Sequence, residues 1–234
     1  VCGCGCLCLH TLSKHDRYDG IKQVSEIGRG GFGVVYNAVD RRSGDRLALK
    51  VPLPQLGLGP STLSAELQKR IAREVALMMK CVHPCVVRCL GLVLGGPSGL
   101  AIAMDLCGAS LLDLVSSSSD DVPSRQQRLR YLLQAAEAIE FLHAKKIVHR
   151  DVKTANLLLD ATGSVRLGDF GMARVAEFVS TYTNSTHSAK GTPAYSSPEQ
   201  LRRGVEVTYA SDVYSFGVVC YEVLSLKKPW EGQD

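Results

Sequence analysis

Polar side chains are concentrated in residues 149–156, whose sequence is HRDVKTAN. This segment lies between the apolar end of a predicted helix and the apolar run Leu157–Leu159. A loop with a purely structural role would not need that density of ionisable groups. Asp169-Phe170-Gly171 follows, with Asp169 thirteen residues after Asn156. A carboxylate and an amide at two loop ends can chelate a hard cation through oxygen, so the pattern favours a cation-binding site.

Residues 28–33 read GRGGFG and are followed by Val34-Val35-Tyr36, which gives the spacing G-x-G-x-x-G-x-V. Glycines let a backbone bend tightly and bring its N–H groups close to phosphate oxygens. Dinucleotide-binding folds share the spacing, but they need a helix directly after the glycines. Here β-branched and aromatic residues follow, which favours a strand. The loop is therefore predicted to join two strands and to cover phosphate groups.

Lys50 and Glu74 are charged residues on two successive predicted elements. Lys50 ends the run Leu47–Lys50 within a strand predicted over 46–51, on the same face as Ala48, and Glu74 lies on a helix predicted over 64–80. Taken singly, a lysine on an edge strand and a glutamate on an amphipathic helix are usually solvated. After a glycine loop, the two together predict a charge pair that directs the ammonium group towards a phosphate.

The elements that must position these residues change in type along the chain. Strands are predicted over 23–27, 34–40, 46–51, 86–94 and 100–106, ahead of helices that begin after Ser124 and cover 212–224. Ser124 and Gln127 form a predicted capping box. The apolar stripe predicted for that helix consists of Leu129, Leu132, Leu133, Ala136, Ile139 and Leu142. A strand-rich part followed by a helix-rich part predicts an α+β chain with two segregated lobes.

Composition narrows the function classes. The chain has 234 residues, 45% of them hydrophobic and 21% charged, as in ordinary globular proteins. Its net charge of +4 comes from scattered residues, so composition gives no case for a nucleic-acid partner. No run of 18 apolar residues occurs, and no transmembrane segment is expected. Five scattered cysteines suit reduced thiols, which predicts a cytoplasmic, intracellular protein.

Four of the nine cysteines alternate near the start, at Cys2, Cys4, Cys6 and Cys8. A metal clip or an acylation patch would be a functional interpretation of this run. It lacks the two-residue gaps and the distant second ligand pair that are typical of zinc sites. It also lacks the charged start of a signal peptide. Residues 1–20 are therefore predicted to be a disordered leader.

In this order, the motifs resemble those of the catalytic domain of eukaryotic protein kinases, serine/threonine type. The resemblance covers about residues 21 to 230 and implies the bilobal protein kinase fold. It implies a kinase domain over 21–234, with a β-rich N-lobe over 21–104, a hinge over 105–109 and a partial helical C-lobe over 110–234. The implied reaction transfers the γ-phosphate of ATP to Ser or Thr hydroxyls of protein substrates.

The resemblance implies ATP contacts from the N-lobe and the hinge. Lys50 contacts the α and β phosphates while paired to Glu74. Met104 closes the back of the adenine pocket, and the Asp105 C=O and Cys107 N–H bond the base. The implied nucleotide-binding residues are Ile27, Gly28, Gly30, Gly33, Val35, Ala48, Lys50, Met104, Asp105, Cys107 and Leu158.

The resemblance likewise implies roles around the polar loop. Asp151 accepts the proton of the substrate hydroxyl and orients it in line, while Lys153 steadies the γ-phosphate. Asn156 and Asp169 hold Mg²⁺, for which Mn²⁺ can substitute. A pseudokinase, which binds nucleotide as a scaffold and transfers nothing, is the alternative from another functional class. The positions that a pseudokinase would be expected to lose are all present, which favours an active enzyme; they are Lys50, Glu74, Asp151, Asn156 and Asp169.

Two features of the resemblance bear on the acceptor and on regulation. Lys153 and the segment 191–195, read GTPAY, are typical of serine/threonine kinases, in which Thr192 bonds Asp151 and Lys153. The sequence SDVYSFG at 211–217 resembles the tyrosine-kinase-like branch, whose members are mostly specific for serine and threonine. The hydroxyl-rich stretch 180–188 is predicted to be phosphorylated, by an upstream kinase or by a second copy in trans, and to dock on Arg150.

Two departures from the family pattern are expected to matter. Ser197-Pro198-Glu199 replaces Ala-Pro-Glu, a change between small residues that should be tolerated. The resemblance stops at Trp230, before the family's last helices and the arginine that normally pairs with the glutamate matched by Glu199. We therefore expect a fragment of a longer protein, with an unpartnered buried carboxylate at Glu199 and reduced stability.

Overall fold

The computed structural model describes residues 20–30, 33–51, 65–94, 100–117, 122–170, 193–202 and 207–230. The predicted Cys-rich leader lies almost wholly outside these residues, and Thr192 and the stretch 180–188 lie outside them entirely. The chain divides into two compact units. Unit 1 contains Val1–Met79 and Cys89–Asp105, and unit 2 contains Lys80–Arg88 and Leu106–Asp234. Unit 1 carries the larger sheet and unit 2 most of the helices, as the predicted α+β class requires.

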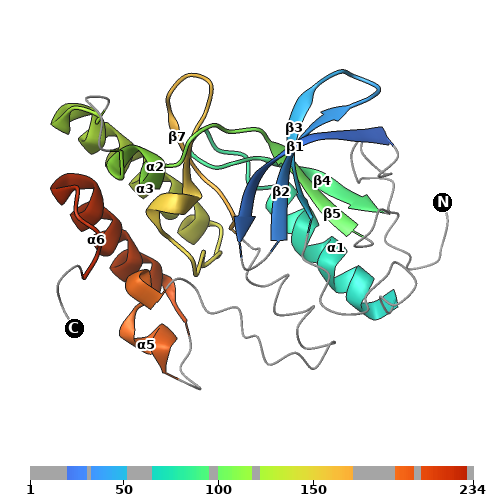
Figure 1. Cartoon of the computed structure of the whole chain (residues 1–234). Helices are drawn as coiled ribbons and strands as arrows, with labels where there is room; N and C mark the ends of the chain where they lie inside the picture. The colour runs from blue at the N-terminus through green and yellow to red at the C-terminus, as the bar shows by residue number, and fades with distance from the viewer. Residues whose placement is uncertain are drawn as a thin grey trace. The chain divides into compact units, whose positions relative to one another are not determined.

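Unit 1 is built on a five-stranded antiparallel sheet (Figure 1). Its strands are β1 (Ile21–Gly30), β2 (Gly33–Asp40), β3 (Arg46–Val51), β4 (Cys89–Leu94) and β5 (Leu100–Asp105), in the order β1-β2-β3-β5-β4. One core cluster includes Ala38, Leu47, Leu49 and Ala103, which alternate along their strands with residues of the opposite face. Helix α1 (Ala65–Met79) packs against β4. β3 is therefore the central strand of the sheet.

The strand predicted over 86–94 begins later than expected, at Cys89. The preceding residues belong to unit 2, where Val86 forms an isolated parallel bridge with Leu167. Val87 N–H donates to Leu167 O at 3.0 Å, and Leu167 N–H donates to Cys85 O at 2.8 Å. The apolar run 86–94 is therefore divided between the units: Val86 and Val87 belong to unit 2, and β4 belongs to unit 1. The periodicity of the sequence alone does not reveal this division.

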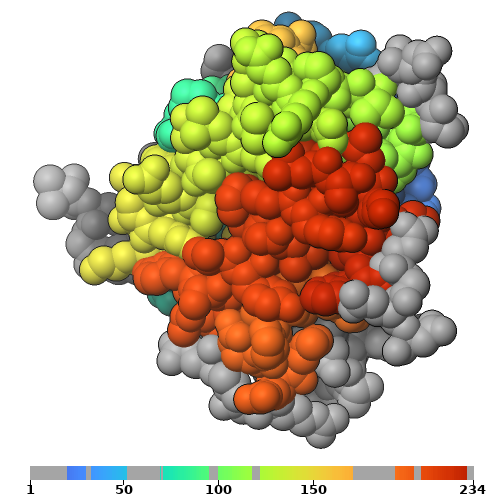
Figure 2. All heavy atoms as spheres, turned by 90° about the vertical axis from the view of Figure 1, so that its left-hand side faces the viewer, coloured from blue at the N-terminus to red at the C-terminus, as the bar shows by residue number. Residues whose placement is uncertain are grey.

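Unit 2 is mainly helical. Its elements are α2 (Leu111–Val115), α3 (Arg125–Ala144), β6 (Leu157–Leu159), β7 (Val165–Leu167), α5 (Pro198–Leu201) and α6 (Tyr209–Ser225), with 3-10 turns at Thr154–Asn156 and Pro193–Tyr195. Figures 1 and 2 show α6 lying along α3, and the two helices pack together. Arg128 of α3 donates from Nη1 to the carbonyls of Val223 and Leu224, both at 2.9 Å. This contact satisfies carbonyls at the end of α6 that have no partner within the helix.

The apolar stripe predicted on α3 is only partly buried. Leu132, Ile139 and Leu142 are buried, but Leu129 is 50% and Leu133 61% exposed. The reason is that α3 buries a second row, which includes Tyr131, Ala135 and Ala138, at positions the prediction did not use. Half of the predicted capping box is observed, because Ser124 Oγ accepts a hydrogen bond from Gln127 N–H at 3.2 Å.

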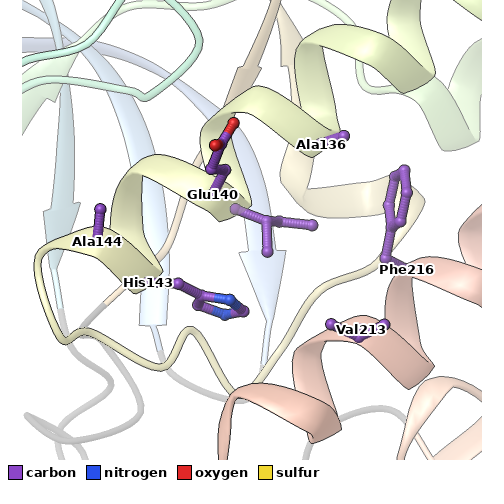
Figure 3. A pocket seen from close by; sticks show the side chains of 7 residues that line it. Ala136, Glu140, His143, Ala144, Val213 and Phe216 are labelled. Carbon is purple, nitrogen blue, oxygen red and sulfur yellow. The ribbon is translucent and has the colours of Figure 1, made fainter.

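A pocket of about 450 Å³ lies between α3 and α6 (Figure 3). It is lined by Ala136, Ile139, Glu140, His143, Ala144, Val213 and Phe216. None of the predicted catalytic or nucleotide-binding residues lines it, so this pocket is not the predicted reaction site. No helix of the described part of the chain is both long and apolar enough to cross a membrane.

The turn between β6 and β7 is organised by one carboxylate. Asp160 accepts hydrogen bonds from Thr162 N–H at 2.8 Å, Thr162 Oγ1 at 2.6 Å and Ser164 N–H at 3.0 Å. It also pairs with Arg166 Nε at 2.9 Å. Burial by itself would raise the pKa of Asp160, but the hydrogen bonds from Thr162, Arg166 and Ser164 outweigh it and hold that pKa well below its ordinary value.

We expect the Asp160 network to stabilise the fold in a pH-dependent way. Because its pKa is lower in the folded state than in the unfolded chain, the stabilisation is complete above the ordinary carboxyl range. It is lost as the pH falls towards the lowered folded pKa. Thermal melts of wild type and Asp160→Ala should therefore differ at pH 7 and converge in acid. Glu26→Gln is the control, since its ion pair with Arg29 is exposed and should contribute little at either pH.

Candidate active site

One face of the unit 1 sheet gathers residues predicted to bind nucleotide. Val35 lies directly opposite Lys50 across the β2–β3 pair, and Ala48 lies opposite Met104 across the β3–β5 pair. Directly opposed residues of antiparallel strands place their side chains on the same face. Alternation along β3 adds Ala48 to the face of Lys50. The structure therefore brings these four predicted residues together on one face.

Lys50 and Glu74 are both buried, which excludes the solvated roles that each would commonly have. Lys50 is 3% and Glu74 7% exposed. Lys50 lies on the central strand of the sheet rather than at an edge. Lysine and glutamate are almost never buried this fully unless their charges are paired. Burial in the same unit is therefore consistent with the predicted charge pair.

The glycine loop has the predicted strand context. β1 ends at Gly30 and β2 begins at Gly33, and these two residues are paired across the antiparallel ladder. A strand, not a helix, follows the last glycine, so the dinucleotide-binding interpretation is excluded. Gly28 lies opposite Val35 in the same ladder, and Ile27 next to it is 48% exposed. Residues 31–32 at the tip lie outside the described part.

Three predicted catalytic residues meet in the polar loop of unit 2. Lys153 Nζ forms an ion pair with Asp151 Oδ2 at 2.8 Å. Asn156 Nδ2 donates to the same oxygen at 3.0 Å and to the Asp151 backbone carbonyl at 2.7 Å. The Asp151 carboxylate is thus held by a cation and an amide, while the loop remains compact around it. These contacts bring Asp151, Lys153 and Asn156 together within one loop.

His149 positions the backbone next to Asp151. Its Nδ1 accepts a hydrogen bond from Asp151 N–H at 3.2 Å, which requires Nδ1 to be unprotonated. Nε2 then carries the hydrogen and donates to the Gly168 carbonyl at 2.8 Å. The ring is buried, with 1% exposed. One imidazole therefore connects the residue before Asp169 to the loop that carries Asp151.

Asp212, on α6, holds the start of the same loop. Its two carboxylate oxygens accept hydrogen bonds from His149 N–H and Arg150 N–H, both at 2.8 Å. His143 Nε2 donates to it as well, at 2.9 Å. Arg150 has a φ of 73°, a left-handed conformation that is costly for a residue with a side chain. The bonds to Asp212 offset that cost, and strain of this kind is common at functional sites.

Asn156 and Asp169 fit the predicted cation site. Because Asn156 Nδ2 is used on Asp151, the carbonyl oxygen of this amide is the end that remains for a hard cation. Gly168 N–H donates to the backbone carbonyl of Asn156 at 2.8 Å. This bond holds the residue before Asp169 against the turn that contains Asn156. Asp169 has a φ of 63°. Among the described residues, no group of three or more His, Cys, Asp or Glu side chains is arranged to hold a metal ion.

The remaining predicted nucleotide residues lie in both units. Asp105 ends β5 in unit 1, while Cys107 and Leu158 belong to unit 2. Gly108 N–H donates to the Leu159 carbonyl at 2.7 Å, so the segment after Cys107 is fixed against β6. An added Cβ on Gly168 would lie 3.4 Å from Val87 Cγ2 and 3.5 Å from Leu158 Cδ1. These are ordinary van der Waals contacts, so packing alone does not require glycine before Asp169.

Sequence reasoning assigned no role to the two buried carboxylates of α6, Asp212 and Glu222. They are 1% and 2% exposed. The signal for both was an acidic residue with apolar neighbours in the helix, within the runs SDVYSF and YEVL. That signal predicts burial with hydrogen-bond donors, but the sequence does not identify the donors.

The expectation for Glu199 was wrong. Its side chain is half-buried and accepts a hydrogen bond from Ser211 Oγ at 2.6 Å. Hydrogen bonds, first from the Ser211 hydroxyl and then from the backbone and from Ser197, hold the pKa of Glu199 below its ordinary value. The carboxylate is therefore satisfied by neighbouring hydroxyls. Ser197 is also more than a tolerated replacement, since it forms a capping box with Gln200 that begins α5.

Comparisons with known proteins show which family and which relatives the chain resembles. Residues 21–234 match the family described as "Protein kinase domain". The chain is 36% identical over 203 residues to Dual specificity protein kinase shkE of Dictyostelium discoideum, which covers 86% of the chain. It is 35% identical over 208 residues to Serine/threonine-protein kinase CTR1 of Arabidopsis thaliana, covering 88%. It is 34% identical over 216 residues to CBL-interacting protein kinase 24 of Oryza sativa subsp. japonica, covering 89%.

The matched segment is a small part of these relatives. It spans 27% of the Dictyostelium protein, 24% of the Arabidopsis protein and 44% of the rice protein. The similarity therefore concerns the kinase domain of these relatives.

Proposed function

Because this chain belongs to the protein kinase family, we propose that it transfers the γ-phosphate of ATP to serine or threonine hydroxyls of protein substrates. The observation that carries the proposal is the Asp151 carboxylate, held at Oδ2 by Lys153 Nζ at 2.8 Å and by Asn156 Nδ2 at 3.0 Å. A general base must be held in place, must remain ionised and must keep an oxygen available to accept a proton.

The proposed step uses Asp151 as the acceptor of the hydroxyl proton. The substrate oxygen forms a bond to the γ-phosphorus as the bond from that phosphorus to the bridging oxygen breaks, and ADP leaves. The proton passes from the substrate hydroxyl to the Asp151 carboxylate. Lys153 stabilises charge on the transferred phosphoryl group. Phosphoryl transfer demands mainly positioning and electrostatic stabilisation, which a preorganised loop supplies.

Lys50 and Glu74 are proposed to hold the other phosphates. A buried ammonium on the sheet face that also carries Val35 and Ala48 is suited to the α and β phosphates, with Glu74 as its charge partner. Asn156 and Asp169 would hold Mg²⁺ or Mn²⁺, which neutralises charge on the phosphate oxygens when bound. These assignments give every buried charge of the predicted site a chemical role.

The preference for serine and threonine rests on Lys153 and on the family pattern around Thr192. The Arabidopsis relative is named a serine/threonine kinase and the Dictyostelium relative a dual-specificity kinase. We place the reaction in the cytoplasm. We further propose that phosphorylation within 180–188, by an upstream kinase or by a second copy in trans, activates the domain by docking on Arg150.

The test is a transfer assay with the full chain, labelled ATP, Mg²⁺ and a peptide library that contains serine, threonine and tyrosine acceptors. We expect phosphoserine and phosphothreonine as products, and a consensus from the peptides selected. Phosphotyrosine as the main product would contradict the acceptor assignment. A thermal shift with ATP in the absence of any transfer would indicate the pseudokinase alternative.

A further inference from the structure

Gln200 is a half-buried residue of α5 whose side chain reaches the catalytic loop, residues 149–156. Its Nε2 donates to the Arg150 carbonyl at 3.0 Å, across 50 residues of sequence. Its Oε1 accepts hydrogen bonds from Ser197 N–H at 3.0 Å and from Ser197 Oγ at 3.2 Å. One side-chain amide therefore joins the start of α5 to the residue before Asp151.

The orientation of the Gln200 amide follows from its partners. A backbone carbonyl can only accept a hydrogen bond, so the atom against Arg150 must be the nitrogen. A backbone N–H can only donate, so the atom against Ser197 must be the oxygen. An ionised glutamate of the same length would supply acceptors alone. Both ends of the contact therefore require an amide at this position.

The Arg150 carbonyl belongs to the same peptide unit as the Asp151 N–H, and the atoms of a peptide unit lie close to one plane. The Asp151 N–H donates to His149 Nδ1 at 3.2 Å. Gln200 therefore holds one edge of this unit and His149 holds the opposite edge. Because the φ of Asp151 is the rotation between this plane and the Asp151 side chain, a fixed plane restricts the direction of the carboxylate.

The backbone at this peptide unit is one that would relax without external contacts. Arg150 has a φ of 73°, a left-handed conformation that is costly for a residue with a side chain. Hydrogen bonds on the unit that follows Arg150 offset that cost. Phosphoryl transfer depends mainly on positioning, so a change in the direction of the Asp151 carboxylate should lower the rate.

We propose that Gln200 is a positioning residue for phosphoryl transfer, which fixes the peptide unit between Arg150 and Asp151 and couples it to the start of α5. This inference rests on the proposed function. Gln200 acts through Asp151 and makes no contact with the reacting atoms. Ser197, which stands where the family pattern has alanine, is the residue that holds the other end of the amide.

Gln200→Glu separates the two ends of the contact. The variant keeps an acceptor for Ser197, and glutamate is a preferred residue at this position of a capping box, so the thermal midpoint should change little. It removes the donor to the Arg150 carbonyl. The kcat for peptide phosphorylation should fall by about tenfold, whereas the KM for ATP should stay within about twofold of wild type. A purely structural role would instead make kcat follow stability.

Gln134 of α3 offers a matched control in the same unit. It is half-buried, and its Oε1 accepts a hydrogen bond from Val165 N–H at 2.9 Å. It lies outside the proposed machinery. Gln134→Glu keeps an acceptor for Val165 and should leave kcat within about twofold of wild type. An equal loss of kcat in Gln134→Glu and Gln200→Glu would show a general effect of added negative charge, and would overturn the inference.

Hydrogen exchange gives a second readout that does not depend on activity. The Asp151 N–H lies in the held peptide unit, so its exchange reports whether the unit is fixed. Gln200→Glu should speed exchange at Asp151 by about tenfold, while the Ser197 N–H, which keeps its acceptor, should exchange at the wild-type rate. If wild type transfers no phosphate, the proposed function fails while this exchange still decides whether Gln200 holds the unit. Unchanged exchange at Asp151, or wild-type kcat in Gln200→Glu, would overturn the positioning role.

Discussion

Replacing Asp151 by asparagine is expected to lower kcat for peptide phosphorylation by about a hundredfold to ten-thousandfold. The amide cannot accept the hydroxyl proton, and it loses the ion pair that Lys153 Nζ makes at 2.8 Å. The shape of the side chain is retained, and Asn156 Nδ2 still reaches the Asp151 backbone carbonyl. The measurement is steady-state kinetics with a fixed peptide, together with a thermal melt that should change little.

Asp113→Asn is the control for this loss. Asp113 is an aspartate of the same unit that accepts hydrogen bonds from Ser110 N–H at 2.8 Å and from Ser110 Oγ at 2.7 Å. It caps α2 and takes no part in the proposed reaction. The kcat of the Asp113→Asn variant should equal that of wild type. Asp151→Asn with wild-type kcat would exclude the general base assigned here.

Replacing Asp212 by alanine is expected to give the largest loss of stability. Asp212 is 1% exposed and accepts hydrogen bonds from His149 N–H, Arg150 N–H and His143 Nε2. Without it, two backbone N–H groups are buried with no acceptor and Arg150 keeps an unfavourable backbone conformation. We expect the free energy of unfolding to fall by about 3–5 kcal/mol. This corresponds to a thermal midpoint lower by about 10 °C.

Asp113→Ala is the control for the stability loss of Asp212→Ala, because it removes a carboxylate that only caps a helix. Asp113 is exposed at the start of a short helix, so its removal should cost about 1 kcal/mol. The Asp212 variant should also lose activity in the part that remains folded, because the start of the catalytic loop is no longer held. Equal midpoints for the two alanine variants would contradict the role assigned to Asp212.

Local chemistry explains which elements the sequence could predict. β3 was predicted over its full extent, Arg46–Val51, because turn residues bound an alternating run. Helix α1 was predicted to within a residue at each end, since Leu67, Ile71, Val75 and Met78 recur at helical spacing. The contacts within the polar loop 149–156 could be anticipated because its charged residues lie close together in the chain, so that their proximity in space needs no long-range information.

The errors arose where a residue's partner is distant in the chain. Glu199 was expected to lack a partner, but Ser211 supplies a hydroxyl from the next helix. Leu129 and Leu133 were expected in the core, but they are exposed, whereas the neighbouring Tyr131 of the same helix is buried. Asp212 and Glu222 received no role, because their donors come from 63 and 68 residues earlier in the chain. The periodicity of a sequence describes the faces of a single helix. Burial and hydrogen-bond partners depend on how pairs of elements pack together.

Trp230 gives the protein an intrinsic optical reporter. It is the single tryptophan of the chain, and its indole N–H donates to the Ala194 carbonyl at 2.7 Å. Half of the side chain is exposed, so its fluorescence is sensitive to water. The emission of Trp230 therefore reports directly on the Pro193–Tyr195 turn, without a label. Stopped-flow mixing with nucleotide or peptide can follow the movement of this turn in real time.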